Sequence, residues 1–251
     1  MGEYLLVHGG LAVGWVWDDV AKRLKTAGHR VHVVDHLPSI GTDPASLGDL
    51  TADASYVRQT LDAIHKPVLL VGHSYSGMVI TEFADHPKVR HTVYLTAMWP
   101  ERGQSALNLV GGVLPPVFTQ RNDGAFEITN DFEFAWKSFC PDLDRDRAQE
   151  VLARFVLQSD SSFAAMSTAP DRTHPTTYVI AARETEASVA AQEAWAANAE
   201  NVVRLPADHM LQLSYPDQLV EVLAQVCRRD LLFRSPRGRV DAGQPGRPGP
   251  R

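Results

Sequence analysis

Ser74 has the surroundings of a nucleophilic serine. It lies at the centre of a G-x-S-x-S pattern, between an apolar, strand-like segment at residues 67–71 and a helical segment at residues 78–85. A serine in a tight turn from a buried strand into a helix exposes its hydroxyl at the end of a sheet, and the turn needs small residues two positions before and after the serine. Gly72 meets the first need, and Ser76 meets the second with only a hydroxymethyl group more than the usual glycine. The spacing therefore predicts that the Ser74 hydroxyl attacks a carbonyl carbon.

His209 is the residue best placed to act as the base for Ser74. A serine hydroxyl becomes a strong nucleophile only when a base takes its proton. His209 comes late in the chain, after a strand-like segment at residues 201–205 and before a helical one near residues 216–228. In a parallel sheet, this position lies on a loop at the same edge as Ser74. We therefore predict that His209 takes the proton.

A carboxylate must hold the tautomer of the base and stabilise the imidazolium that forms. The order serine, acid, histidine along the chain places this carboxylate after the strand-like segment at residues 176–181. Glu184 is our choice there, with Glu186 as the neighbour that would replace it and Glu101, after an earlier strand, as a third possibility. Asp208 adjoins the histidine, and its side chain is expected to point elsewhere.

Two backbone N–H groups are predicted to bind the oxyanion of a tetrahedral intermediate. One belongs to Tyr75, the residue after the nucleophile. The other belongs to Gly10, in the His-Gly-Gly loop that follows the first strand-like segment at residues 4–7. Glycines in that loop let the backbone approach a substrate closely. Loss of one such donor typically lowers the rate by about 10²–10³.

Strand-like and helical segments alternate along most of the chain. Short apolar runs indicate strands at residues 4–7, 30–35, 67–71, 91–96, 176–181 and 201–205. Apolar residues at helical spacing indicate helices at residues 16–27, 50–64, 78–85, near 189–198 and near 216–228. Apolar strands separated by amphipathic helices are typical of a mostly parallel sheet with helices on both faces. The predicted fold class is therefore α/β.

The alternation stops between about residues 100 and 175, which we interpret as a helical cap insertion over the carboxyl edge of the sheet. Short helical patterns occur there at residues 132–139 and 145–157. Open α/β sheets bind ligands at this edge. Because the insertion is rich in aromatic residues, it suits a small apolar or aromatic substrate. The predicted pocket lining is Gly9, Leu11, Trp15, Trp99, Phe118, Trp136 and Met210, with Trp17, Phe126, Phe132 and Phe134 as further wall candidates.

Three aspartates in the insertion have the alternate spacing of a calcium loop. Asp142, Asp144 and Asp146 are not accompanied by the glycine and the terminal glutamate that such a loop needs. We interpret them as the solvated start of a helix and predict no metal site. Cys140, just before them, is expected to be a small buried residue and not a nucleophile.

The composition is that of one ordinary folded domain. The 251 residues are 44% hydrophobic and 22% charged, which is enough for a full core without disulfides or a structural metal. The net charge of −6 argues against nucleic acid as a partner. The two cysteines favour a reducing compartment, and no apolar run approaches the roughly 18 residues of a membrane helix. With no signal-peptide pattern at the start, we expect a cytoplasmic protein. The oligomeric state has no signal in the sequence.

The end of the chain differs in composition from the rest. Of the 18 residues at 234–251, eight are Gly or Pro and five are Arg. Such a segment cannot bury enough apolar surface to offset the entropy of ordering it. We therefore expect a disordered basic tail after one folded domain at residues 1–233.

These features resemble the α/β-hydrolase superfamily, and within it the group of plant hydroxynitrile lyases, methyl-salicylate-type esterases and their bacterial esterase relatives. The resemblance covers nearly all of residues 2–229. It rests on the His-Gly-Gly loop with Gly-Trp-Val-Trp at residues 14–17, the turn at Ser74, the strand before Glu184, and the run Asp-His-Met-Leu-Gln-Leu from residue 208. It implies a catalytic set of Ser74, His209 and Glu184, oxyanion donors at Gly10 and Tyr75, and neither a metal nor an organic cofactor.

Differences from that group narrow the implied activity. The acid is Glu184 where the group usually has aspartate. Members that cleave cyanohydrins have lysine where this chain has Met210 and a hydroxyl residue where Gly9 stands, so cyanide release is not expected. The resemblance then implies hydrolysis of a small carboxylic ester, lactone or thioester through an acyl-enzyme on Ser74. Two alternatives stay open: a lyase or cyclase step on a specialised metabolite in the same site, and a ligand-binding protein with a vestigial triad.

Overall fold

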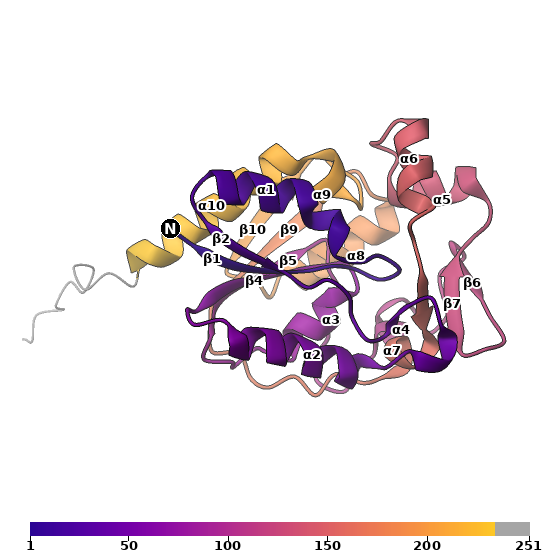
Figure 1. Cartoon of the computed structure of the whole chain (residues 1–251), viewed down its shortest axis with the longest axis horizontal. Helices are drawn as coiled ribbons and strands as arrows, with labels where there is room; N and C mark the ends of the chain where they lie inside the picture. Colours follow the sequence, from indigo (N-terminus) through magenta and orange to yellow (C-terminus); the bar gives the residue numbers. More distant parts are fainter. Residues whose placement is uncertain (234–251) are drawn as a thin grey trace, which may run out of the picture.

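The computed structural model describes residues 1–233, apart from the side chains of residues 186, 187 and 230–233. Its central sheet consists of β1 (Glu3–Val7), β2 (Arg30–Val33), β4 (Val68–His73), β5 (Val89–Leu95), β9 (Thr176–Ala181) and β10 (Asn201–Leu205). The order across the sheet is β10-β9-β5-β4-β1-β2, and every pairing between these strands is parallel (Figure 1). The strand-like runs of the sequence thus all belong to one sheet.

The middle of the sheet is apolar because both of its faces are covered. In β4, Val71 pairs with Leu6 of β1 and with Val93 of β5. Successive side chains of a strand point to opposite faces, so Leu69 and Val71 join the core on one side while Val68 and Leu70 join the core on the other. All four side chains are completely buried. A continuous apolar run is therefore what this position requires.

Helices cover the two faces of the sheet. On one face lie α1 (Asp18–Thr26) and α10 (Pro216–Phe233), and on the other lie α2 (Leu50–Ala63), α3 (Ser76–Thr81) and α8 (Glu186–Ala196) (Figure 1). The predicted α/β fold with helices on both faces is confirmed. The helix expected from residue 16 begins instead with a 3-10 turn at Gly14–Trp17, and α1 follows it.

The cap lies beyond the carboxyl ends of the strands (Figure 1). It contains α4 (Ala106–Leu109), α5 (Phe132–Phe139), α6 (Arg145–Leu152) and α7 (Asp160–Ala164). Its strands β8 (Leu157–Ser159), β7 (Ala125–Ile128) and β6 (Phe118–Gln120) form an antiparallel sheet, and β3 (Ile40–Gly41), from an earlier part of the chain, adds to it beside β8. The cap is thus part sheet, which the helical prediction for this segment missed.

The helix predicted at residues 145–157 is divided in the structure. It ends as α6 at Leu152, and Leu157–Ser159 forms β8 between β3 and β7. The partners of β8 come from distant parts of the chain, so its pairing overrides the local helical spacing.

Three further predictions concern the tail, membrane-spanning helices and the cysteines. The predicted tail at residues 234–251 lies outside the described residues. Among residues 1–233, no helix combines the length and the apolarity needed to cross a membrane. Cys140 and Cys227 are both buried and free.

Candidate active site

Ser74 lies in a tight turn between β4 and α3. Its φ angle is +55°, a left-handed conformation that costs energy for a residue with a side chain. The turn forces the strand and the helix together: a Cβ on Gly72 would lie 2.6 Å from Ile80 Cδ1, and one on Gly77 would lie 1.9 Å from the Met98 carbonyl oxygen. A side chain at Gly77 would overlap the Met98 backbone, whereas one at Gly72 would require the Ile80 side chain to shift.

Ser76 takes the place of the last glycine in the usual pattern. Its hydroxyl is fully buried and lies 3.0 Å from the Val7 carbonyl oxygen and 2.9 Å from the His73 carbonyl oxygen. The extra hydroxymethyl group is therefore accommodated by hydrogen bonds that connect the turn to β1. This departure from the pattern leaves the turn intact.

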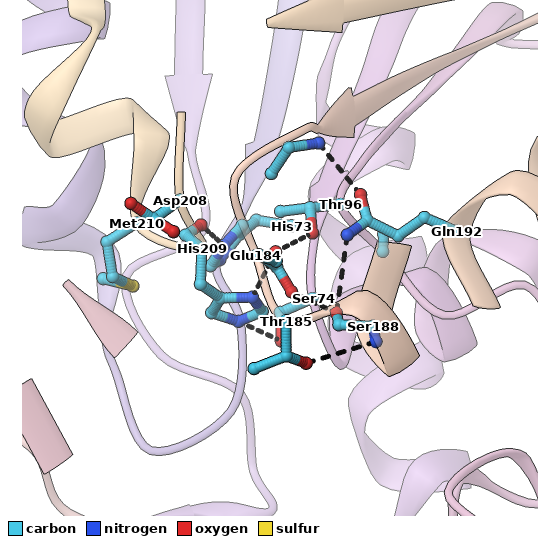
Figure 2. Close-up of polar contacts among 12 residues, drawn as sticks. His73, Ser74, Thr96, Glu184, Thr185, Ser188, Gln192, Asp208, His209 and Met210 are labelled. Carbon is cyan, nitrogen blue, oxygen red and sulfur yellow. Dashed lines mark hydrogen bonds and ion pairs between the residues drawn. The ribbon is translucent and has the colours of Figure 1, made fainter. Parts of the chain in front are cut away.

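The structure brings the predicted base, His209, into contact with both Ser74 and the predicted acid, Glu184 (Figure 2). Its Nε2 lies 2.9 Å from Ser74 Oγ, and its Nδ1 lies 3.1 Å from Glu184 Oε1. With the proton on Nδ1, the neutral ring donates to Glu184 and accepts from the Ser74 hydroxyl. The three side chains follow β4, β9 and β10 and meet at the carboxyl edge of the sheet, as expected from the sequence.

Glu184 is a largely buried carboxylate with several donors. Its side chain is 10% exposed. Oε1 also accepts a 2.5 Å hydrogen bond from Thr96, and Oε2 accepts one from Ser188 (Figure 2). Burial opposes ionisation, but the attraction of His209 and these hydrogen bonds outweigh it, so the pKa of Glu184 lies below its usual value. The group is therefore ionised at neutral pH.

The other two acid candidates differ in position. Glu101 is an exposed residue in the loop after β5. Glu186 begins α8, and its side chain lies outside the described part of the structure. Glu184 is the candidate that the structure places against His209.

His73 is a buried residue of the site that the sequence analysis missed. Its Nε2–H donates to the His209 carbonyl oxygen at 2.9 Å, and its Nδ1 lies 3.4 Å from Gln212 Nε2 (Figure 2). Burial, with a smaller effect of His209, lowers the pKa of His73 to about 3, so its ring is neutral at ordinary pH. A signal for this pair exists in the sequence: His73 adjoins the nucleophile, and Gln212 belongs to the Asp-His-Met-Leu-Gln-Leu run.

The glycine loop after β1 lies beside the nucleophile. A Cβ on Gly9 would lie 3.0 Å from Ser74 Cβ, and one on Gly10 would lie 3.5 Å from Tyr75 Cβ. The same Gly10 position is only 2.3 Å from Gln158 Oε1, so a side chain there would require this glutamine of the cap to shift. The two residues whose N–H groups are the predicted oxyanion donors, Gly10 and Tyr75, therefore lie close to each other in space and beside Ser74.

An aromatic cluster from the cap covers this region. The Phe139 ring packs against the rings of His209 at 5.5 Å and of Phe118 at 5.8 Å. Phe163 packs against Phe118 at 6.3 Å and stacks on Tyr75 at 5.6 Å. Phe118 thus lies among the rings around the site, whereas Phe139 and Phe163 were not on the predicted lining.

The other residues predicted to line the pocket lie in different surroundings. Leu11 is buried with φ +57°, and Met210 is also buried. Trp136 donates from Nε1 to Leu143 O at 3.0 Å within the cap. Trp99 stacks on Tyr94 at 4.1 Å. Trp15 lies under the Arg154 guanidinium and lines a surface hollow of about 690 Å³ beside α1.

The aspartates at positions 142 and 144 have different surroundings in the structure. Asp144 caps α6 by accepting from the Arg147 N–H at 2.9 Å, in line with a helix start. Asp142 is mostly buried, which the prediction of a solvated cluster missed. Among the described residues, no group of three or more His, Cys, Asp or Glu side chains is arranged to hold a metal ion.

Comparison with known proteins places this geometry in a family. The model of the alpha/beta hydrolase family matches residues 4–222. The chain belongs to the alpha/beta hydrolase family. Its resemblance to the esterase and hydroxynitrile lyase group is confirmed by the relatives it matches.

Two curated relatives of this alpha/beta hydrolase illustrate the similarity. The carbendazim hydrolyzing esterase of Nocardioides sp. (strain SG-4G) is 39% identical over 132 residues, which cover 50% of this chain and 54% of the relative. Polyneuridine aldehyde esterase of Rauvolfia serpentina is 30% identical over 110 residues, 41% of each chain. The matched region thus spans about half the length of these relatives or less.

Solved structures share the fold over almost the whole length. A pyrethroid hydrolase from Sphingobium faniae JZ-2 superposes with a TM-score of 0.76 at 24% identity, covering 90% of this chain and 97% of that one. A polyneuridine aldehyde esterase mutant superposes with a TM-score of 0.75 at 18% identity, covering 90% and 99%. At these identities the likeness concerns the fold.

Proposed function

We propose that this alpha/beta hydrolase is a serine hydrolase that cleaves a small carboxylic ester, lactone or thioester through an acyl-enzyme on Ser74. The observation that carries the proposal is the hydrogen-bonded chain from Ser74 Oγ through the His209 ring to Glu184. The strained turn at Ser74 supports it, because strain at a residue with these partners is typical of a nucleophile.

The first half of the proposed reaction forms the acyl-enzyme. His209 Nε2 takes the Ser74 proton while Oγ attacks the carbonyl carbon. The oxyanion accepts hydrogen bonds from the N–H groups of Gly10 and Tyr75. The intermediate collapses, the carbon–oxygen or carbon–sulfur bond breaks, and the leaving group takes the proton from Nε2.

The second half releases the acid. Water gives a proton to His209 Nε2 and attacks the acyl carbonyl, and the intermediate expels Ser74, which recovers that proton. Glu184 accepts the Nδ1–H hydrogen bond throughout and stabilises the imidazolium. Because the pKa of Glu184 lies below its usual value, its negative charge is present at neutral pH.

We infer that the substrate is apolar or aromatic on at least one side of the ester. The rings of Phe118, Phe139 and Phe163 around the site support this inference, because aromatic walls bind flat, apolar groups. Relatives named for hydrolysis of carbendazim and of polyneuridine aldehyde make these compounds and simple methyl esters the first candidates to test. The two free, buried cysteines support a reducing, cytoplasmic location.

One assay tests the proposal. The protein is incubated with p-nitrophenyl acyl esters and, separately, with a serine-directed phosphonate whose adduct is located by mass spectrometry. We expect burst kinetics and an adduct on Ser74. Ser74→Ala should lower turnover by at least about 10³-fold, while Ser161→Ala, at an exposed serine of the cap, should leave it unchanged.

Other results would favour the alternatives. An adduct on Ser74 without turnover of any ester would favour a lyase or cyclase in the same site. Neither adduct nor turnover would favour a ligand-binding protein. For cyanide release in particular, Gly9 supplies no hydroxyl and the buried Met210 supplies no ammonium group, so nothing in the site favours it.

A further inference from the structure

The turn between α5 and α6 of the cap binds the loop that carries His209. The Phe139 carbonyl oxygen accepts from the Met210 N–H at 3.2 Å, and the Asp142 carboxylate accepts from the Asp208 N–H at 2.9 Å. Figure 2 shows Asp208 and Met210 next to His209. Both backbone N–H groups that flank the proposed base therefore donate to the cap.

Asp142 also reaches the loop of the proposed acid. Its Oδ1 forms an ion pair with Arg183, the residue directly before Glu184. The two loops are also connected directly: the Arg183 N–H donates to the Ala207 carbonyl oxygen at 3.0 Å, and the Arg183 guanidinium lies 3.9 Å from the Asp208 carboxylate. Asp142 adds a connection from outside both loops. One carboxylate thus contacts the residue before the acid and the residue before the base.

Burial of the Asp142 carboxylate raises the cost of losing its contacts. The Asp142 side chain is only 10% exposed, but its partner Arg183 is 48% exposed, so solvent weakens the ion pair and the hydrogen bond from the Asp208 N–H is the stronger of the two contacts. Removal of this carboxylate would leave the Asp208 N–H without its acceptor in a poorly solvated place, which favours a shifted loop. A shift of about 1 Å in a catalytic group can lower a rate by about 10²-fold.

We propose that Asp142 is a positioning residue, which holds the two loops so that the His209 ring stays within hydrogen-bonding distance of both Ser74 and Glu184. This inference rests on the proposed function of those three residues. The Phe139 carbonyl oxygen and the Asp142 carboxylate then support the base from the cap, because loss of their hydrogen bonds would release the backbone on both sides of His209.

The test compares three variants of the full chain with the wild type. Asp142→Ala removes both contacts. Asp142→Asn keeps an oxygen that can accept from the Asp208 N–H but loses the charge opposite Arg183. Asp146→Asn removes an exposed carboxylate of α6 a few residues away and is the matched control. For each, we measure kcat and KM for a p-nitrophenyl ester and the rate of phosphonate labelling at Ser74.

A spectroscopic measurement reports on His209 directly. The proton on His209 Nδ1, hydrogen-bonded to Glu184, gives a downfield proton NMR resonance when that bond is in place. We expect Asp142→Ala to lower kcat and the labelling rate by about 10- to 100-fold with little change in KM, and to broaden or shift this resonance. Asp142→Asn should lose less, and Asp146→Asn should match the wild type.

Opposite results would overturn the inference. It fails if folded Asp142→Ala keeps the wild-type kcat and resonance, or if Asp146→Asn loses as much. If Asp142→Ala does not fold, Asp142→Asn and Arg183→Gln are measured in its place: each should lower kcat, and the double variant should lose less than the two single losses combined. Absence of a Ser74 adduct in the wild type would refute the proposed function, and the resonance would still decide whether Asp142 positions His209.

Discussion

At the scale of single residues, the proposed acid of the site is a glutamate, whose side chain is one methylene longer than that of aspartate. The longer side chain is held by donors on two sides, Thr96 on Oε1 and Ser188 on Oε2. Thr96 has φ +39°, a conformation that residues with a side chain seldom adopt. Strain at the residue that binds the acid indicates that the end of β5 is shaped to receive Glu184.

The choice of acid leads to a prediction. Glu184→Ala should lower kcat by about 10²-fold or more, yet by less than Ser74→Ala, because the nucleophile and the base still form the acyl-enzyme slowly when only the acid is lost. Steady-state kinetics on a p-nitrophenyl ester measure both variants. Glu186→Ala is the matched control and should stay close to the wild type. If it loses more activity than Glu184→Ala, the acid has been assigned to the wrong residue.

At the scale of elements, the position of Ser74 depends on how closely α3 approaches the loop after β5. The Ser74 carbonyl oxygen accepts from the N–H groups of Gly77 at 3.0 Å and of Met98 at 3.1 Å. The turn is thus bonded both to its own helix and to the neighbouring loop. Gly77 permits this approach, because the Met98 backbone occupies the space that a side chain at position 77 would need.

Gly77→Ala should therefore destabilise the fold and the site together. Its Cβ would overlap backbone atoms, which cannot rotate away, so we expect a loss of at least about 2 kcal/mol in the free energy of unfolding. Urea denaturation followed by circular dichroism measures it. Gly41→Ala is the control, since its Cβ would meet only the flexible end of Leu47 at 3.3 Å. Equal stability of the two variants would contradict the close-approach argument.

At the scale of the whole molecule, one buried carboxyl connects three separate segments. Asp53 of α2 accepts from the Ser39 N–H at 2.8 Å and from the Ser39 hydroxyl at 2.6 Å, just before β3. It also accepts from the Tyr75 hydroxyl at 2.8 Å, next to the nucleophile. Burial raises the pKa of Asp53 to about 6, despite these hydrogen bonds.

This raised pKa predicts the direction of a pH effect on stability. Between its ordinary value of 3.8 and about 6, the unfolded chain releases a proton that the folded chain retains, so the contribution of Asp53 is fully present below the lower value and is lost as pH rises through the higher one. The unfolding free energy of the wild type minus that of Asp53→Asn should therefore decrease from pH 4 to pH 7, by up to about 3 kcal/mol.

Urea denaturation of both proteins across this pH range measures that difference. Asp62→Asn, which removes an exposed carboxyl from the same helix, is the matched control. A difference that grows with pH would show that the Asp53 carboxyl is ionised in the folded protein and would contradict the prediction.

The sequence by itself determined the sheet and the places of the proposed nucleophile and base. Residues 67–71 are apolar because β4 lies in the middle of a sheet covered on both faces, and this pattern is local. The turn at Ser74 also depends on neighbours in the chain, since Gly72 and Ser76 must be small whatever surrounds them. The position of His209 after the last strand follows from the rule that parallel strands end at one edge.

Only the tertiary structure decided which other groups serve these residues. Glu184 and Glu186 are equivalent in spacing, and the contact with His209 depends on how the loops after β9 and β10 pack. The same holds for Thr96, His73 and Asp142, which meet their partners across long stretches of chain. Strands of the cap such as β6 and β8 are three residues long and stabilised by distant partners. Local patterns record which face of an element is buried, whereas contacts between distant loops depend on the packing of the whole fold.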